Sequence, residues 1–194
     1  MSQVGDSENT TGAFRKKSAT EIAPSLLIGG GEPLASSGFF ESDGLQIYYE
    51  SYGGGEGHPI VLVHGWGSDL NASWVATGWV EALQRERQVI ALDIRGHGES
   101  DRPLQQSLYS YTAMARDVLN LMDTFGISRP DFMGYSMGAF MGAHLLGHHS
   151  ERFAAMVLGG IGSETEESIA VVDLIAQALR ADDVSEITNP IGIA

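Results

Sequence analysis

The 194-residue chain contains no cysteine, which excludes disulfide bonds, cysteine-based zinc sites and thiol nucleophiles. Basic side chains are also scarce: 11 Lys and Arg stand against 25 Asp and Glu, which gives a formal net charge of -14. Such an acidic chain repels phosphate backbones and anionic lipid, so we expect neither nucleic acid nor a membrane surface as a partner.

Long apolar runs are absent as well. The stretch from Ile22 to Ile28 is short, is broken by Pro24 and is followed by three glycines. It is therefore neither a signal peptide nor a membrane span, and we expect a cytoplasmic location.

The composition that remains, 43% hydrophobic and 19% charged, is ordinary for one globular domain. Residues 1–38 are rich in Ser, Thr and Gly without periodicity, which predicts a flexible leader.

Regular patterning begins at Phe39. Residues 45–52 are rich in β-formers, and apolar runs at 59–63, 88–92, 131–133 and 154–158 predict buried strands. Helical spacing predicts helices over 70–86, 114–125, 137–149 and 169–179. This alternation predicts a doubly wound, mostly parallel α/β sheet with an antiparallel entry.

Ser136 lies between two glycines in the stretch Gly134-Tyr-Ser-Met-Gly138, after a predicted strand and before a helix of small residues. In this setting a serine occupies a strained turn that lifts its hydroxyl clear of the sheet, and bulkier residues at Gly134 and Gly138 would collide. The alternative is a glycine-rich turn that holds an inert serine.

The loop His64-Gly-Trp-Gly67 leaves the end of an earlier buried strand. A backbone N–H of this loop, that of Trp66, can join the N–H of Met137 to form an oxyanion hole. Considered alone, the loop could equally be an ordinary strand-end turn in which His64 is a satisfied polar residue.

These motifs together resemble the α/β-hydrolase superfamily over about residues 39–162. They stand in the family's order, and Ser150–Gly159 is similar to its approach to the sixth core strand. The three motifs are His64-Gly65-Trp66, Asp93-Ile-Arg-Gly-His-Gly-Glu-Ser100 and Gly134-Tyr-Ser-Met-Gly138.

The resemblance implies that Ser136 is a nucleophile and that the N–H groups of Trp66 and Met137 hold the oxyanion. It also implies that a second loop has a structural role, and the residues that shape this loop are Asp93, Arg95, His97 and Ser100. We therefore do not expect His97 to be the catalytic base. Family members with aspartate at the elbow are dehalogenases and epoxide hydrolases, and Ser136 argues against that chemistry.

The order Ser, acid, His predicts two further residues after Ser136. His144, His148 and His149 lie along the following helix, where His144 is already roughly 12 Å from Ser136, so no histidine of the chain qualifies as the base. Glu164 is a candidate acid, as are Glu166 and Glu167, although seven acids between residues 164 and 186 also read as a solvated surface. The run Gly159-Gly-Ile-Gly162 resembles a dinucleotide-binding turn but lacks its third glycine. We therefore reject a dinucleotide-binding site at this position.

We therefore expect an incomplete α/β-hydrolase core over 39–162 that lacks the last strands, and the start of a lid or cap over 163–194. The complete protein would cleave an ester, thioester or related carbonyl bond of a small molecule through an acyl-enzyme, with no metal and no organic cofactor. Two alternatives are a non-catalytic ligand-binding or regulatory relative and a truncated gene product without function. Ending at Ala194 would expose the edge of strand 154–158, and we expect self-association through it.

Overall fold

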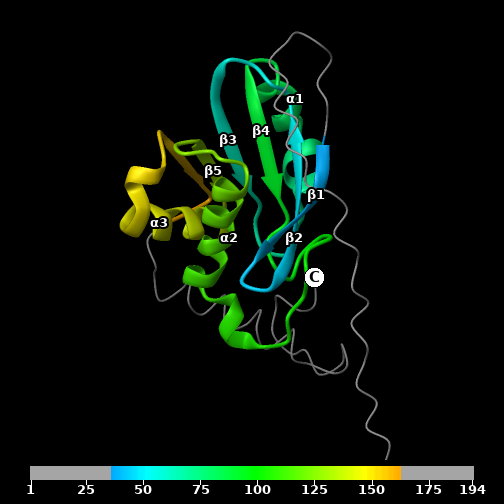
Figure 1. Cartoon of the computed structure of the whole chain (residues 1–194), viewed down its shortest axis with the longest axis vertical. Helices are drawn as coiled ribbons and strands as arrows, with labels where there is room; N and C mark the ends of the chain where they lie inside the picture. The colour runs from blue at the N-terminus through cyan, green and yellow to red at the C-terminus, as the bar shows by residue number, and fades with distance from the viewer. Residues whose placement is uncertain (1–35, 163–194) are drawn as a thin grey trace, which may run out of the picture.

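The computed structural model describes residues 36–162 (Figure 1). The expected leader lies almost wholly outside this range, as do the expected helix over 169–179 and Glu164. The described strands are β1 (Ser36–Ser42), β2 (Leu45–Tyr52), β3 (Gly57–Val63), β4 (Arg87–Leu92), β5 (Asp131–Tyr135) and β6 (Met156–Gly159). The helical segments are η1 (Asn71–Val75), α1 (Trp79–Leu83), η2 (Gln106–Tyr109), α2 (Tyr111–Thr124), α3 (Met137–His149) and η3 (Ser150–Arg152).

The six strands form one sheet in the order β1-β2-β4-β3-β5-β6. β2 pairs antiparallel with both β1 and β4, while β3, β4, β5 and β6 pair in parallel. The predicted mostly parallel α/β sheet with an antiparallel entry is confirmed. Short, continuously apolar strands produce this arrangement because helices cover both of their faces.

The two central strands, β3 and β4, direct alternate side chains to opposite faces of the sheet. Val61, Val63 and Ile90 pack in a cluster with α2 and α3, which contact each other (Figure 1). Leu62 and Val89 pack in the second cluster, against η1 and α1. The parallel strands all end at one edge of the sheet, where the loops after β3, β4 and β5 meet.

Helix α2 follows its predicted periodicity. The Ser110 side chain accepts a hydrogen bond from the Ala113 N–H at its start, and the chain turns at Gly126 with a φ of 65°. Met114, Val118, Leu121 and Met122 are buried, as their spacing predicted. In residues 36–162 no helix is long and apolar enough to cross a membrane.

The prediction of a helix over residues 70–86 is wrong, because the chain does not form one continuous helix there. The chain forms the short π-helical segment η1, turns at Gly78 with a φ of 83°, and restarts as α1. Trp74 and Val80 are buried as the spacing indicated, but Trp79 is 45% exposed. A left-handed glycine in the middle of the run separates its two apolar halves, which the apolar spacing alone does not reveal.

The last described strand differs slightly from expectation. β6 begins at Met156, two residues after the expected start at Ala154, and ends at Gly159. The Ala154 N–H nevertheless donates to the Pro130 carbonyl, so the chain already runs beside the β5 approach there.

A buried ion pair and its hydrogen bonds connect four segments of the chain. Arg95, in the loop after β4, donates from Nε and Nη2 to the Asp117 carboxylate of α2 at 2.7 and 2.6 Å, and both side chains are buried. Ser42 of β1 donates to the same carboxylate, and Arg95 Nη1 donates to the Leu108 carbonyl. Because every strong donor and acceptor is paired, the pair holds the β4 loop against α2.

Candidate active site

Ser136 lies at the turn between β5 and α3, with a φ of 51° and a ψ of −114°. Within residues 36–162 only Asp43 shares a positive φ among non-glycine residues. Such a conformation costs about 1–3 kcal/mol and persists only where the surroundings impose it. Here the Ser136 N–H donates to the Gly159 carbonyl, and its own carbonyl accepts from Ala139 and Phe140 at the start of α3.

The two glycines that flank Ser136 allow the turn to form. A Cβ on Gly134 would lie 2.3 Å from the Gly138 carbonyl oxygen, and a Cβ on Gly138 would lie 2.2 Å from the Val63 oxygen. The start of α3 therefore lies directly on the backbones of β5 and β3, and only glycine fits at either position.

The loop after β3 runs beside the serine. A Cβ built on Gly65 would be 3.3 Å from the Ser136 Cβ, so Gly65 and Ser136 are immediate neighbours. The next residue, Trp66, and the residue after the serine, Met137, line the same cleft. In the described part of the chain, neither of their backbone N–H groups donates to a protein acceptor. Within residues 36–162, both predicted oxyanion donors are thus without a protein acceptor, and both belong to residues that line one cleft.

The cleft has a volume of about 700 Å³. Its described lining carries no acidic or lysine or arginine side chain and combines aromatic rings with methionines: Trp66, Gly67, Gly96, His97, Tyr109, Tyr111, Met114 and Met137. A lining of this kind suits an apolar, uncharged group.

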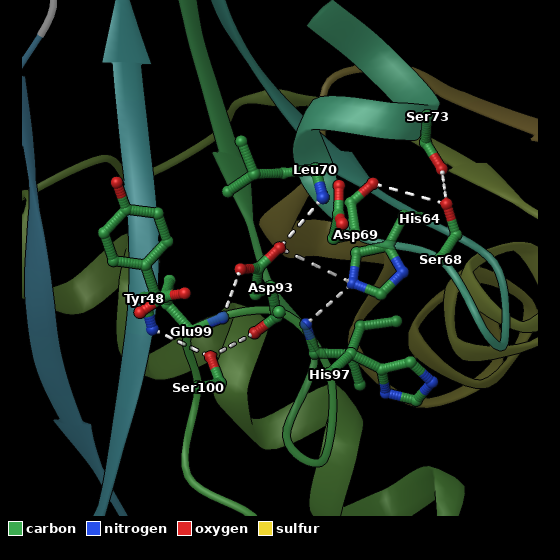
Figure 2. Close-up of polar contacts among 12 residues, drawn as sticks. Tyr48, His64, Ser68, Asp69, Leu70, Ser73, Asp93, His97, Glu99 and Ser100 are labelled. Atoms are coloured by element: carbon green, nitrogen blue, oxygen red, sulfur yellow. Dashed lines mark hydrogen bonds and ion pairs between the residues drawn. The ribbon is translucent and has the colours of Figure 1, made fainter.

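His64 is fully buried and forms two hydrogen bonds, and Figure 2 shows the one at Nε2, which also lies 3.9 Å from Asp93 Oδ1. Its Nε2 accepts from the Ile94 N–H at 3.0 Å, so the ring proton is on Nδ1, which donates to the Gly65 carbonyl at 2.7 Å. Burial lowers the pKa of His64, and the hydrogen bond to Gly65 opposes this only in part. The imidazole is therefore neutral, and it holds the loop that carries Trp66.

His97 holds the same loop from the other side. Its Nε2 accepts from the Gly67 N–H at 3.1 Å, and its Nδ1 lies 3.3 Å from the Arg95 carbonyl, to which it donates. The sequence placed His97 in a structural loop but gave no sign of this contact with Gly67, because the two residues are 30 positions apart in separate loops.

Asp93 organises the loop after β4 (Figure 2). Its carboxylate accepts from the backbone N–H groups of Leu70 and Glu99, each at 2.8 Å. Ser100 Oγ donates to the Asp93 carbonyl and accepts from the Tyr48 N–H. These bonds are internal to the scaffold, and they set the position from which His97 reaches Gly67.

No imidazole is placed to act as a base on Ser136. His58 lies at the beginning of β3, at the opposite end of the strand from the loop that carries Trp66. Both ring nitrogens of His64 already form hydrogen bonds with the backbone. His144, His148 and His149 lie along α3, where His148 Nδ1 donates to the His144 carbonyl. In residues 36–162 no hydrogen bond joins Ser136 Oγ to a histidine, and no group of three metal-ligating side chains occurs.

The fold and this site define a class of protein. A family model described as alpha/beta hydrolase fold matches residues 58–184, and the chain belongs to that family. The predicted superfamily is confirmed.

Among curated proteins, the chain is 38% identical over 118 residues to the dihydrolipoyllysine-residue acetyltransferase component of the acetoin cleaving system of Pseudomonas putida; the match covers 61% of this chain and 30% of that protein. Across the first three curated relatives, it spans between 30% and 41% of their length.

Two solved structures are also similar. A hydrolase from Pseudomonas aeruginosa PA01 is 31% identical with a TM-score of 0.65, and the match covers 79% of this chain and 56% of that one. The enol-lactonase from Burkholderia xenovorans LB400 is 31% identical with a TM-score of 0.61, covering 73% and 54%.

Proposed function

We propose that the protein is a serine hydrolase that cleaves a carboxylic ester, thioester or related carbonyl bond through an acyl-enzyme on Ser136. One observation carries the proposal: Ser136 is held at a positive φ between β5 and the N-terminus of α3, beside the Gly65 loop. Family membership supports the hydrolase class, and a serine at the elbow favours acyl transfer over the aspartate chemistry of dehalogenases and epoxide hydrolases.

The proposed reaction uses the geometry as follows. Ser136 Oγ attacks the substrate carbonyl carbon, and the carbonyl oxygen becomes an oxyanion that accepts hydrogen bonds from Trp66 and Met137 N–H. The N-terminus of α3 adds a favourable field for that charge. When the tetrahedral intermediate collapses, the leaving group departs with a proton, and water then hydrolyses the ester on Ser136.

A fast reaction also needs a base for the serine proton. None of the six histidines of the chain is placed for it, so we infer that the base is supplied by a part of the protein outside these 194 residues. The 194 residues alone should then hydrolyse activated esters several powers of ten more slowly than a complete triad. Turnover of p-nitrophenyl acetate at ordinary enzyme rates, abolished by Ser136→Ala, would overturn this inference.

A covalent probe tests the nucleophile without a complete triad. An alkyl fluorophosphonate should add once, at Ser136: the Oγ–P bond forms, fluoride leaves, and the serine proton passes to solvent. The rate should rise with pH because no local base is present. Intact-mass analysis should show the adduct in the parent and in Ser150→Ala, an exposed control serine at the end of α3, but not in Ser136→Ala.

The absence of a placed histidine also favours a second candidate, a family member that binds an apolar ligand in the cleft without catalysis. The same experiment separates the two. Binding of a neutral aromatic ester with no adduct on Ser136 at any pH would support the binding protein and contradict the hydrolase.

A further inference from the structure

The Trp66 N–H belongs to a peptide group whose other end is held by His64. His64 Nδ1 donates to the Gly65 carbonyl oxygen at 2.7 Å, and Gly65 C=O and Trp66 N–H are two ends of the same peptide unit. Because that unit is planar and trans, its C=O and N–H point in opposite directions. A hydrogen bond that fixes the direction of the carbonyl therefore also fixes the direction of the N–H.

The next peptide is fixed as well. The Gly67 N–H donates to His97 Nε2 at 3.1 Å, so the residue that carries the oxyanion donor has a histidine hydrogen bond on each side. The two rings lie against each other, edge to face, with centroids 5.3 Å apart. Each ring is anchored to the loop after β4. His64 accepts from the Ile94 N–H (Figure 2), and His97 donates to the Arg95 carbonyl.

We propose that His64 and His97 are positioning residues that together orient the Trp66 N–H toward the reaction centre, an inference that rests on the proposed function of Ser136. They hold the loop as a pair of neutral imidazoles, each with its proton on Nδ1. The bond accepted by the Gly65 carbonyl also polarises the peptide, which makes the Trp66 N–H a stronger donor. Neither histidine exchanges a proton with substrate.

The two ends of the His97 ring can be tested separately. A glutamine at position 97 can place its amide oxygen where Nε2 is and accept from Gly67, whereas an asparagine reaches only as far as Nδ1. We expect the Gly67 amide to exchange hydrogen about 2- to 10-fold faster in His97→Asn and His97→Ala than in the parent, as loss of one hydrogen bond implies. His97→Gln should restore parent exchange.

The fluorophosphonate reaction of Ser136 provides the second readout. We expect it to be about 10-fold slower in His97→Asn and His97→Ala, less than the about 10²–10³ lost on removing an oxyanion donor outright. His97→Gln should recover most of the rate. His148→Gln and His148→Asn, on the exposed end of α3, should match the parent in both readouts.

A third readout does not depend on reactivity or on substitution. The nitrogen-15 shifts of both imidazoles should show a protonated Nδ1 and an unprotonated Nε2 at neutral pH. The opposite tautomer in either ring, or equal Gly67 exchange in all three His97 variants, would overturn the proposal. If the parent gives no adduct on Ser136, the proposed function fails, and tautomers and Gly67 exchange still decide whether the histidines hold the loop.

Discussion

His64 is a buried imidazole that can form both of its hydrogen bonds only when it is neutral. A second proton on Nε2 would face the Ile94 N–H, which already points at that nitrogen. Burial is the main reason that its pKa is lowered, and the hydrogen bond to Gly65 and the carboxylates of Asp93 and Asp69 oppose this only in part. The ring is therefore a source of pH dependence in the stability of the fold.

The sign of this dependence follows from the lowered pKa. As pH falls below the ordinary histidine value of 6.5, the unfolded chain binds a proton at position 64 before the folded chain does. The contribution of His64 to the free energy of unfolding is thus complete above pH 6.5 and is lost as pH falls through the folded pKa, by up to about 1.4 kcal/mol per pH unit.

We predict that His64→Asn lowers stability and flattens its dependence on pH. The asparagine amide can still donate to the Gly65 carbonyl, but it does not titrate and leaves the Ile94 N–H unpaired. Urea unfolding between pH 5 and 8 should show a shallower slope of unfolding free energy against pH than in the parent, while the control His58→Asn, at the exposed beginning of β3, keeps the parent slope. Identical slopes in His64→Asn and the parent would contradict this account.

Single residues also show which parts of the site the sequence could predict. Ser136 and its two glycines form a local pattern, because the contacts that exclude a Cβ arise from chain neighbours and the strand directly beneath. The contacts of His64 with Ile94 and of His97 with Gly67 join separate loops, so no local pattern encodes them. The sequence accordingly left the loop open between an oxyanion loop and an ordinary turn in which His64 is a satisfied polar residue. The structure shows that both ring nitrogens of His64 are hydrogen-bonded, and the oxyanion role of the loop stays a prediction.

Among the elements, α3 depends most on close backbone approach. Its first turn lies on the end of β3, where a side chain on Gly138 would overlap two carbonyl oxygens, and a side chain on Gly142 would meet Phe132 and Leu158. Small residues on this face let the helix N-terminus sit directly behind Ser136. A glycine at the far end of α3, Gly147, has no atom within 4 Å of a built Cβ and serves as a control.

We predict that Gly134→Val and Gly138→Val each destabilise the fold by more than about 3 kcal/mol, because the clash is with backbone that cannot rotate away. Ser136→Ala should change the free energy of unfolding by less than about 0.5 kcal/mol, since it removes only a hydroxyl. Gly147→Val should also be nearly neutral. Denaturant midpoints measure all four; parent-like midpoints for both Gly134→Val and Gly138→Val would mean that α3 does not rest on these backbones.

Elements differ in how well the sequence predicted them, for a physical reason. β2 matches its expected bounds because a run of β-forming residues ends at a clear break, and α3 matches its bounds because a run of small residues suited to a helix does the same. The helix over 70–86 fails because the period continues across Gly78, whose left-handed φ divides it into η1 and α1. The Arg95–Asp117 pair was not foreseen either, since it joins a loop to a helix and is completed by Ser42, 75 positions away from Asp117.

At the scale of the whole molecule, the sheet has an edge at each end of its strand order, and the two edges differ. β1, at one end, is part of an antiparallel hairpin with β2. β6, at the other end, pairs only with β5 among the described strands. Val157 in the middle of β6 is 53% exposed. A short apolar strand with one unpaired side is a template for pairing with another chain.

We predict that the 194-residue chain self-associates through β6, and that salt strengthens the association. The formal net charge of -14 opposes contact between copies at low ionic strength. Raising salt to about 1 M shortens the screening length to about 3 Å and removes that opposition. Light scattering should therefore report a larger particle at about 1 M salt than at low salt. Val157→Lys, which places a charge on the edge strand, should reduce the effect, whereas Val75→Lys, an exposed position at the end of η1, should leave it unchanged. A monodisperse monomer at both salt concentrations would show that the β6 edge is covered in solution.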